Sequence, residues 1–164
     1  MESGKLLAEV DSYISQNAKA IFNNFLQDAG HRISKADDSS IGIVRISFLR
    51  GSAIDDSPWF RIDCYGHDDY ASLSRLHFYC GNDEIIQLIN AHKPVQQFYD
   101  GPSKKEKMDQ EFKLLKQHSA EYFHESLMRT SQEIINEIDV EHVASYGVRE
   151  VFYGDYLGKC IKLL

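Results

Sequence analysis

The sequence predicts an α+β domain in which an antiparallel or mixed sheet of about five strands packs against an N-terminal helix and a long central helix. Three observations predict this class. An apolar period of about 3.6 residues opens the chain, three stretches of alternating apolar and polar residues follow, and a second long helical period precedes a C-terminal hairpin. The expected order of elements is α-β-β-β-α-α-β-β, and 164 residues suit a single domain spanning positions 1–164.

The first helix is expected over residues 6–26, where apolar residues recur at the i, i+3, i+4, i+7 spacing of one helix face. Gly30 is a reasonable stop for this helix, because glycine readily adopts the left-handed conformation that ends many helices. The polar and acidic stretch 34–40 is then expected to be a loop.

Three strands are expected next, over residues 41–50, 59–65 and 73–80. In the first of them Val44 and Ile46 alternate with polar residues, which is typical of a half-buried strand. Because the connections between the three strands are short, we expect an antiparallel meander.

Two helices are expected after the meander. Asn82 or Asp83 is the predicted N-cap of a short helix over residues 84–91. Ser103 is the predicted cap of a long helix over residues 104–138, whose length predicts a kink or a break. The candidate positions for that break are Ser126, Thr130 and Ser131.

The end of the chain, residues 148–164, is expected to form a hairpin. Gly154 and Asp155 suit a two-residue turn, because glycine tolerates the positive φ that such turns need. Gly158 is a candidate for a bulge in the second strand.

Composition narrows the classes of partner. Lys and Arg number 18 against 25 Asp and Glu, so the formal net charge is −7, which disfavours binding to nucleic acid or to an anionic membrane. No apolar run is long enough to span a bilayer, and the start of the chain lacks the pattern of a secretory signal. Three widely spaced cysteines argue against a disulfide framework. We therefore expect a soluble cytoplasmic protein without a cofactor.

Three Asp pairs lie in predicted loops, at positions 37–38, 55–56 and 68–69. In a meander the first and third of these loops lie at one end of the sheet, so Asp37, Asp38, Asp68 and Asp69 are expected to converge there with His67 beside them. Such a cluster would attract a basic partner. Two alternatives stay open, because loop Asp residues also favour turns and solubility and can hold a hard cation.

Aromatic side chains suggest a second surface. Strand alternation places Trp59, Arg61 and Tyr65 on the face opposite Phe60, together with His77, Tyr79 and Asp63. A sheet face that mixes Trp, Tyr, Arg and Asp has the composition of a protein interface. The alternative is that helices cover this face and make its aromatic residues part of the core.

Two patterns resemble catalytic motifs, but we interpret both as structural. The spacing of Glu121 and His124 occurs in di-iron bundles, but those need a second such motif, and we expect a solvated helix face here. Cys64 and Cys80 fall on the apolar side of their strands, where a free cysteine is usually a small buried hydrophobe.

The leading hypothesis is a non-catalytic protein-binding module that neutralises a basic protein partner, by the logic of immunity proteins and antitoxins. A small enzyme or ligand-binding domain, with a pocket between the sheet and the long helix and with His67, Asp69, Arg61 and His77 as its candidates, is the alternative. A homodimer formed through the long helix is the third hypothesis. The residues predicted to bind the partner are Asp37, Asp38, Asp68, Asp69, His67, Trp59, Arg61, Tyr65 and Tyr79.

Overall fold

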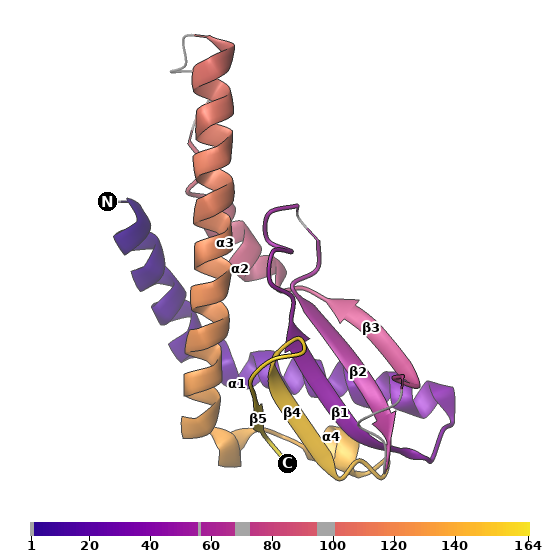
Figure 1. The fold of residues 1–164 in the computed structure, drawn as a ribbon. Coiled ribbons are helices and arrows are strands. Elements are labelled where there is room, and N and C mark those ends of the chain that lie inside the picture. The colour runs from indigo at the N-terminus through magenta and orange to yellow at the C-terminus, as the bar shows by residue number, and fades with distance from the viewer. Residues whose placement is uncertain (1, 56, 68–72, 95–100) are drawn as a thin grey trace.

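In the computed structural model, which describes residues 2–55, 57–67, 73–94 and 101–164, a mixed sheet lies against long helices (Figure 1). The predicted fold class and order of elements are confirmed, with a short 3-10 helix and a one-turn helix added before the terminal hairpin. The elements are α1 (Glu2–Ala36), β1 (Ile41–Phe48), β2 (Phe60–Gly66), β3 (Leu76–Cys80), α2 (Asp83–Asn90), α3 (Pro102–Glu133), η2 (Ile135–Glu137), α4 (Glu141–Ala144), β4 (Glu150–Asp155) and β5 (Cys160–Lys162).

The sheet has the strand order β3-β2-β1-β4-β5. β1, β2 and β3 form the predicted antiparallel meander, while β4 lies parallel to β1, so the sheet is mixed. Val44 in the central strand faces Cys64 of β2 on one side and Val151 of β4 on the other. Because β1 and β4 run in the same direction, the residues that follow them meet at one end of the sheet.

The helices pack on one face of this sheet. Phe22 and Phe25 of α1 contact Tyr153 and Phe60, with ring centroids 5.1 and 4.9 Å apart. Figure 1 shows α1 passing behind the sheet, and no described helix crosses the face turned toward the viewer. The helix-covered face carries the core side chains Val44, Ile46, Phe48, Phe60, Ile62, Cys64, Val151 and Tyr153.

The first helix is longer than predicted, because Gly30 does not end it. α1 continues through Gly30 to Ala36, so the first three residues of the predicted loop 34–40 are helical. A Cβ at position 30 would lie 2.1 Å from the backbone oxygen of His142. Gly30 therefore allows α4 to approach the backbone of α1, which is the packing role of a glycine and not its capping role.

The long helix differs from its prediction at both ends. Gly101, with φ 103°, precedes Pro102 at the helix start, and no side chain caps it, so Ser103 is not the cap. The helix runs unbroken through residues 126–131 and ends at Glu133, where the 3-10 helix η2 follows. The short helix α2, by contrast, has the predicted cap, since Asn82 accepts a hydrogen bond from the backbone N–H of Ile85.

The hairpin turn also lies elsewhere than predicted. Gly154 and Asp155 are the last two residues of β4, and the chain turns after them. Leu157 in the turn takes a positive φ of 57°. Gly154 has a different role, because a Cβ there would lie 2.2 Å from the backbone oxygen of Lys159 on the returning chain. No helix in the described part of the chain is long and apolar enough to cross a membrane.

Candidate functional site

The face of the sheet that the helices leave uncovered carries an ordered Arg–Asp pair. Arg61 places its Nε 3.0 Å from both carboxylate oxygens of Asp63, and its Nη2 lies 2.8 Å from Oδ1. The Asp63 side chain is 1% exposed and that of Arg61 is 22% exposed. The hydrogen bonds that Arg61 donates to Asp63 raise the pKa of Arg61, so the guanidinium stays charged and is held in one orientation.

Two tyrosines surround this guanidinium. Tyr79 is the residue of β3 that pairs with Arg61 in the sheet. The centre of the Arg61 guanidinium lies 5.8 Å from the ring centroid of Tyr79 and 5.4 Å from that of Tyr156. Tyr79 and Tyr156 are 50% and 42% exposed. Arg45 fixes the turn that carries Tyr156, since its Nη2 donates to the backbone oxygen of Asp155 at 2.9 Å. We call Arg61, Tyr79 and Tyr156 the Arg–Tyr cluster.

The structure places the other predicted aromatic residues differently. Trp59 is 3% exposed, so the expectation that it shares the open face was wrong. Trp59 precedes the first ladder residue of β2, where strand alternation does not apply, and its ring packs against Phe123 of α3. Tyr65 is partly buried on the open face, and His77 is exposed there with its ring against Tyr79.

Of the four Asp residues predicted to cluster at one end of the sheet, the structure describes Asp37 and Asp38. Asp38 is paired with Arg75 and accepts hydrogen bonds from Ser40, which lower the pKa of its carboxyl group most strongly through the Ser40 side chain. His67 donates its backbone N–H to the Ser40 oxygen at 3.2 Å, so the loop before β1 and the turn after β2 do meet. Asp37 is exposed with φ 50°. Asp68 and Asp69 lie outside the described residues, so the predicted four-carboxylate cluster stays a prediction.

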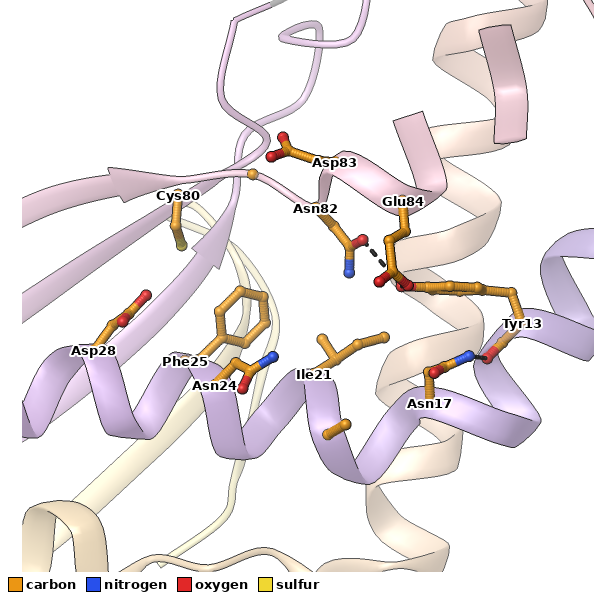
Figure 2. Close-up of a pocket in the computed structure, with 12 residues that line it drawn as sticks. Tyr13, Asn17, Ile21, Asn24, Phe25, Asp28, Cys80, Asn82, Asp83 and Glu84 are labelled. Atoms are coloured by element: carbon orange, nitrogen blue, oxygen red, sulfur yellow. Dashed lines mark hydrogen bonds between the residues drawn. The ribbon is translucent and has the colours of Figure 1, made fainter. Parts of the chain in front are cut away.

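A pocket of about 300 Å³ opens between α1 and the corner where β3 leads into α2 (Figure 2). Ile21 and Phe25, each 5% exposed, form its apolar floor. Tyr13 stands at one end, where its hydroxyl lies 3.1 Å from Asn82 Oδ1 and 3.0 Å from Glu84 Oε2. The other polar residues around the pocket are Asn17, Asn24, Asp28 and Asp83.

One residue that sequence reasoning misplaced lies where α3 packs against β1 and β4. His124, expected on a solvated helix face, has a fully buried side chain. Its ring stacks on Phe48, with centroids 4.5 Å apart and planes 9° apart. Its Nδ1 lies 2.8 Å from the hydroxyl of Tyr153, and its Nε2 lies 3.1 Å from Asp155 Oδ1.

The partners of His124 define its protonation. A carboxylate only accepts hydrogen bonds, so Nε2 carries the proton that points to Asp155, and Nδ1 accepts from the Tyr153 hydroxyl. Arg50 completes the group, with its Nη2 3.0 Å from the same Asp155 oxygen. Burial lowers the pKa of His124 even though Asp155 opposes that effect. The network is fully paired with a neutral imidazole.

The cysteines have the predicted structural character. Burial raises the pKa of Cys64 and of Cys80 to about 12, so both thiols are protonated at neutral pH. Within the described ranges, no group of three or more His, Cys, Asp or Glu side chains is placed to hold a metal ion. Comparison with known proteins adds no assignment, because no family model, no curated protein and no solved structure matches this chain.

Proposed function

We propose that this chain is a non-catalytic protein-binding module that binds and neutralises a basic protein partner through the uncovered face of its sheet. The observation that carries the proposal is the Arg–Tyr cluster, in which a buried aspartate holds Arg61 between two half-exposed tyrosines. Tyr and Arg are the residue types that contribute most to binding at protein interfaces, together with Trp.

Preorganisation supports the same proposal. The Arg61 side chain loses little conformational freedom on binding, because three hydrogen-bond contacts to Asp63 already hold it. Tyr156 is held too, since its backbone N–H donates to the Phe48 oxygen at 3.1 Å. Leu157, 84% exposed in the same turn, adds apolar area beside the cluster. A partner therefore meets a rigid surface with aromatic and apolar contacts.

Charge selects the kind of partner. The formal net charge of −7 gives the whole molecule a negative field, which speeds encounter with a basic protein and slows encounter with an acidic one. The predicted acidic cluster at positions 37, 38, 68 and 69 would strengthen that field at one end of the sheet. We expect replacement of these four Asp residues by Asn to slow association and to flatten its dependence on salt.

Site-specific photo-crosslinking in the native host tests the surface. A photoreactive phenylalanine analogue replaces Tyr79 or, in a second variant, Tyr156. The control carries it at Leu114, which is also exposed (55%) but lies on α3. The expected result is one basic protein crosslinked from positions 79 and 156 and absent from position 114. Crosslinking of that protein from position 114 alone would contradict the proposed surface.

Neutralisation is tested with the purified pair. The partner's own activity is measured with increasing amounts of the wild-type chain and of the Tyr79→Ala/Tyr156→Ala variant. We expect stoichiometric inhibition by the wild-type chain and a loss of affinity of at least about tenfold in the variant, the size of effect that hot-spot residues produce. A partner that is bound but fully active would contradict neutralisation and leave binding intact.

A further inference from the structure

We propose that the pocket between α1 and the β3–α2 corner binds an alkyl chain that ends in a guanidinium or ammonium group. The ligand is either a small free cation or the side chain of an arginine or lysine on another protein. This site lies on the helix side of the sheet and does not depend on the Arg–Tyr cluster, so either proposal can fail alone.

The size of the pocket suits a side chain or a small molecule. Its volume of about 300 Å³ is at the lower end of the range for ligand pockets. At roughly 30 Å³ for each water, it holds about ten waters or a ligand of similar volume. The apolar floor formed by Ile21 and Phe25 can contact methylene groups, and the Phe25 ring offers a cation a polarisable partner.

The polar rim of the pocket selects a cation. Asp28 lies at one end of the pocket, and Asp83 and Glu84 lie toward the other (Figure 2). None of the described residues that line the pocket is Lys or Arg. The basic residue on the next turn of α1, Arg32, is placed over the Phe78 ring at 4.3 Å. An anion would therefore meet three carboxylates with only Arg32 near one end of the pocket, whereas a donor-only group such as guanidinium finds acceptors at both ends.

Side-chain amides add further acceptors. Asn17 donates its Nδ2 to the backbone oxygen of Tyr13 at 2.9 Å, which leaves its Oδ1 as an acceptor at the pocket. The side chains of Asn24 and Asp28 make no hydrogen bond or ion pair with any other described residue. The protonated thiol of Cys80 contributes no charge, because burial and the nearby Asp28 raise its pKa to about 12.

Substitution of Asp28 can distinguish a binding role of the pocket carboxylates from a structural role. Asp83 and Glu84 lie in the first turn of α2, where acidic residues stabilise a helix start, and Glu84 also accepts a hydrogen bond from Tyr13. Asp28 has neither function, since it projects from the middle of α1 toward the pocket. Its replacement by Asn keeps the shape of the side chain and removes only the charge.

The experiment is an NMR titration of the full chain with n-butylguanidinium, a free alkylguanidinium with a single charge, and with a capped Gly-Arg-Gly peptide. We expect saturable shifts of backbone amides in residues 20–28 and 80–84, and an increase in Kd of about tenfold in Asp28→Asn. Glu111→Gln is the matched control, because it removes one negative charge from an exposed position on α3 outside the pocket. That control is expected to bind like the wild-type chain.

The two ligands distinguish the two sources of the cation. Tighter binding of the peptide supports a side chain of another protein, and tighter binding of n-butylguanidinium supports a free cation. Absence of saturable shifts with both ligands would overturn the proposal. An equal loss of affinity in Asp28→Asn and Glu111→Gln would also overturn it, because the attraction would then follow the net charge of the molecule and not the pocket.

Discussion

The imidazole of His124 lies face to face on the ring of Phe48, with centroids 4.5 Å apart and planes 9° apart. This stack joins the long helix α3 to the last residue of the central strand β1. Both nitrogens of the ring are also hydrogen-bonded, to Tyr153 and Asp155 of β4. A single histidine thus connects three elements that are far apart in the sequence.

Stability is expected to fall on acidification because of His124. Burial lowers the pKa of this group, so below about pH 6.5, its ordinary value, the unfolded chain binds a proton that the folded chain does not. The stabilising contribution is full above that pH and is lost as the pH falls toward the lowered pKa. Urea unfolding between pH 8 and pH 5 measures this slope.

The matched variants for this experiment are His124→Gln and His118→Gln. His124→Gln is expected to lower stability at pH 8 and to flatten the dependence of stability on pH. His118 is exposed on the same helix, so His118→Gln is expected to leave both unchanged. A slope in His124→Gln equal to that of the wild-type chain would assign the pH dependence to other groups.

Tyr153→Phe tests the second hydrogen bond of the network. Tyr153 is fully buried, and its hydroxyl is the donor that Nδ1 of His124 accepts. Its removal leaves a buried acceptor unpaired, so we expect a loss of about 1–3 kcal/mol in the free energy of unfolding. Tyr146→Phe, at an exposed position, is the control and is expected to change stability by less than about 0.5 kcal/mol.

Arg61→Ala is expected to be more destabilising than removal of both members of its ion pair. The single variant leaves the buried carboxylate of Asp63 without its partner, which costs about 3–5 kcal/mol. The double variant Arg61→Ala/Asp63→Ala removes that charge as well and is expected to recover most of the loss. Denaturant unfolding of the two variants measures the difference, and an additive effect in the double variant would contradict this account.

Gly30→Ala is expected to destabilise the fold by about 1–3 kcal/mol, because its Cβ would meet the backbone oxygen of His142 at 2.1 Å. Gly4 offers a matched control in the same helix, since a Cβ at that position has no atom within 4 Å. Gly4→Ala is expected to be neutral or to stabilise by up to about 1 kcal/mol. Thermal unfolding compares the two, and equal effects would contradict the packing role of Gly30.

Local patterns in the sequence were sufficient for the order of elements. The alternation in β1 and β2 identified the core side of each strand, and Asn82 marked the start of α2, because these features depend on neighbours within a few residues. The open face with Arg61 and Tyr79 follows from the same alternation. Trp59 is the exception, since it stands outside the ladder and its neighbours come from α3.

What only the tertiary structure decided is the environment of residues on the long helix and at the element ends. His124 lies off the apolar stripe of α3, yet it is buried, because α3 packs against α1 on one side and against Phe48 and Tyr153 on another. The contacts of Gly30 with α4 and of Arg50 with Asp155 join residues far apart in the sequence. A periodic pattern of apolar residues does not predict such contacts either. The sequence by itself determined the elements and their core faces; packing between distant segments decided which polar groups are buried and where the pocket opens.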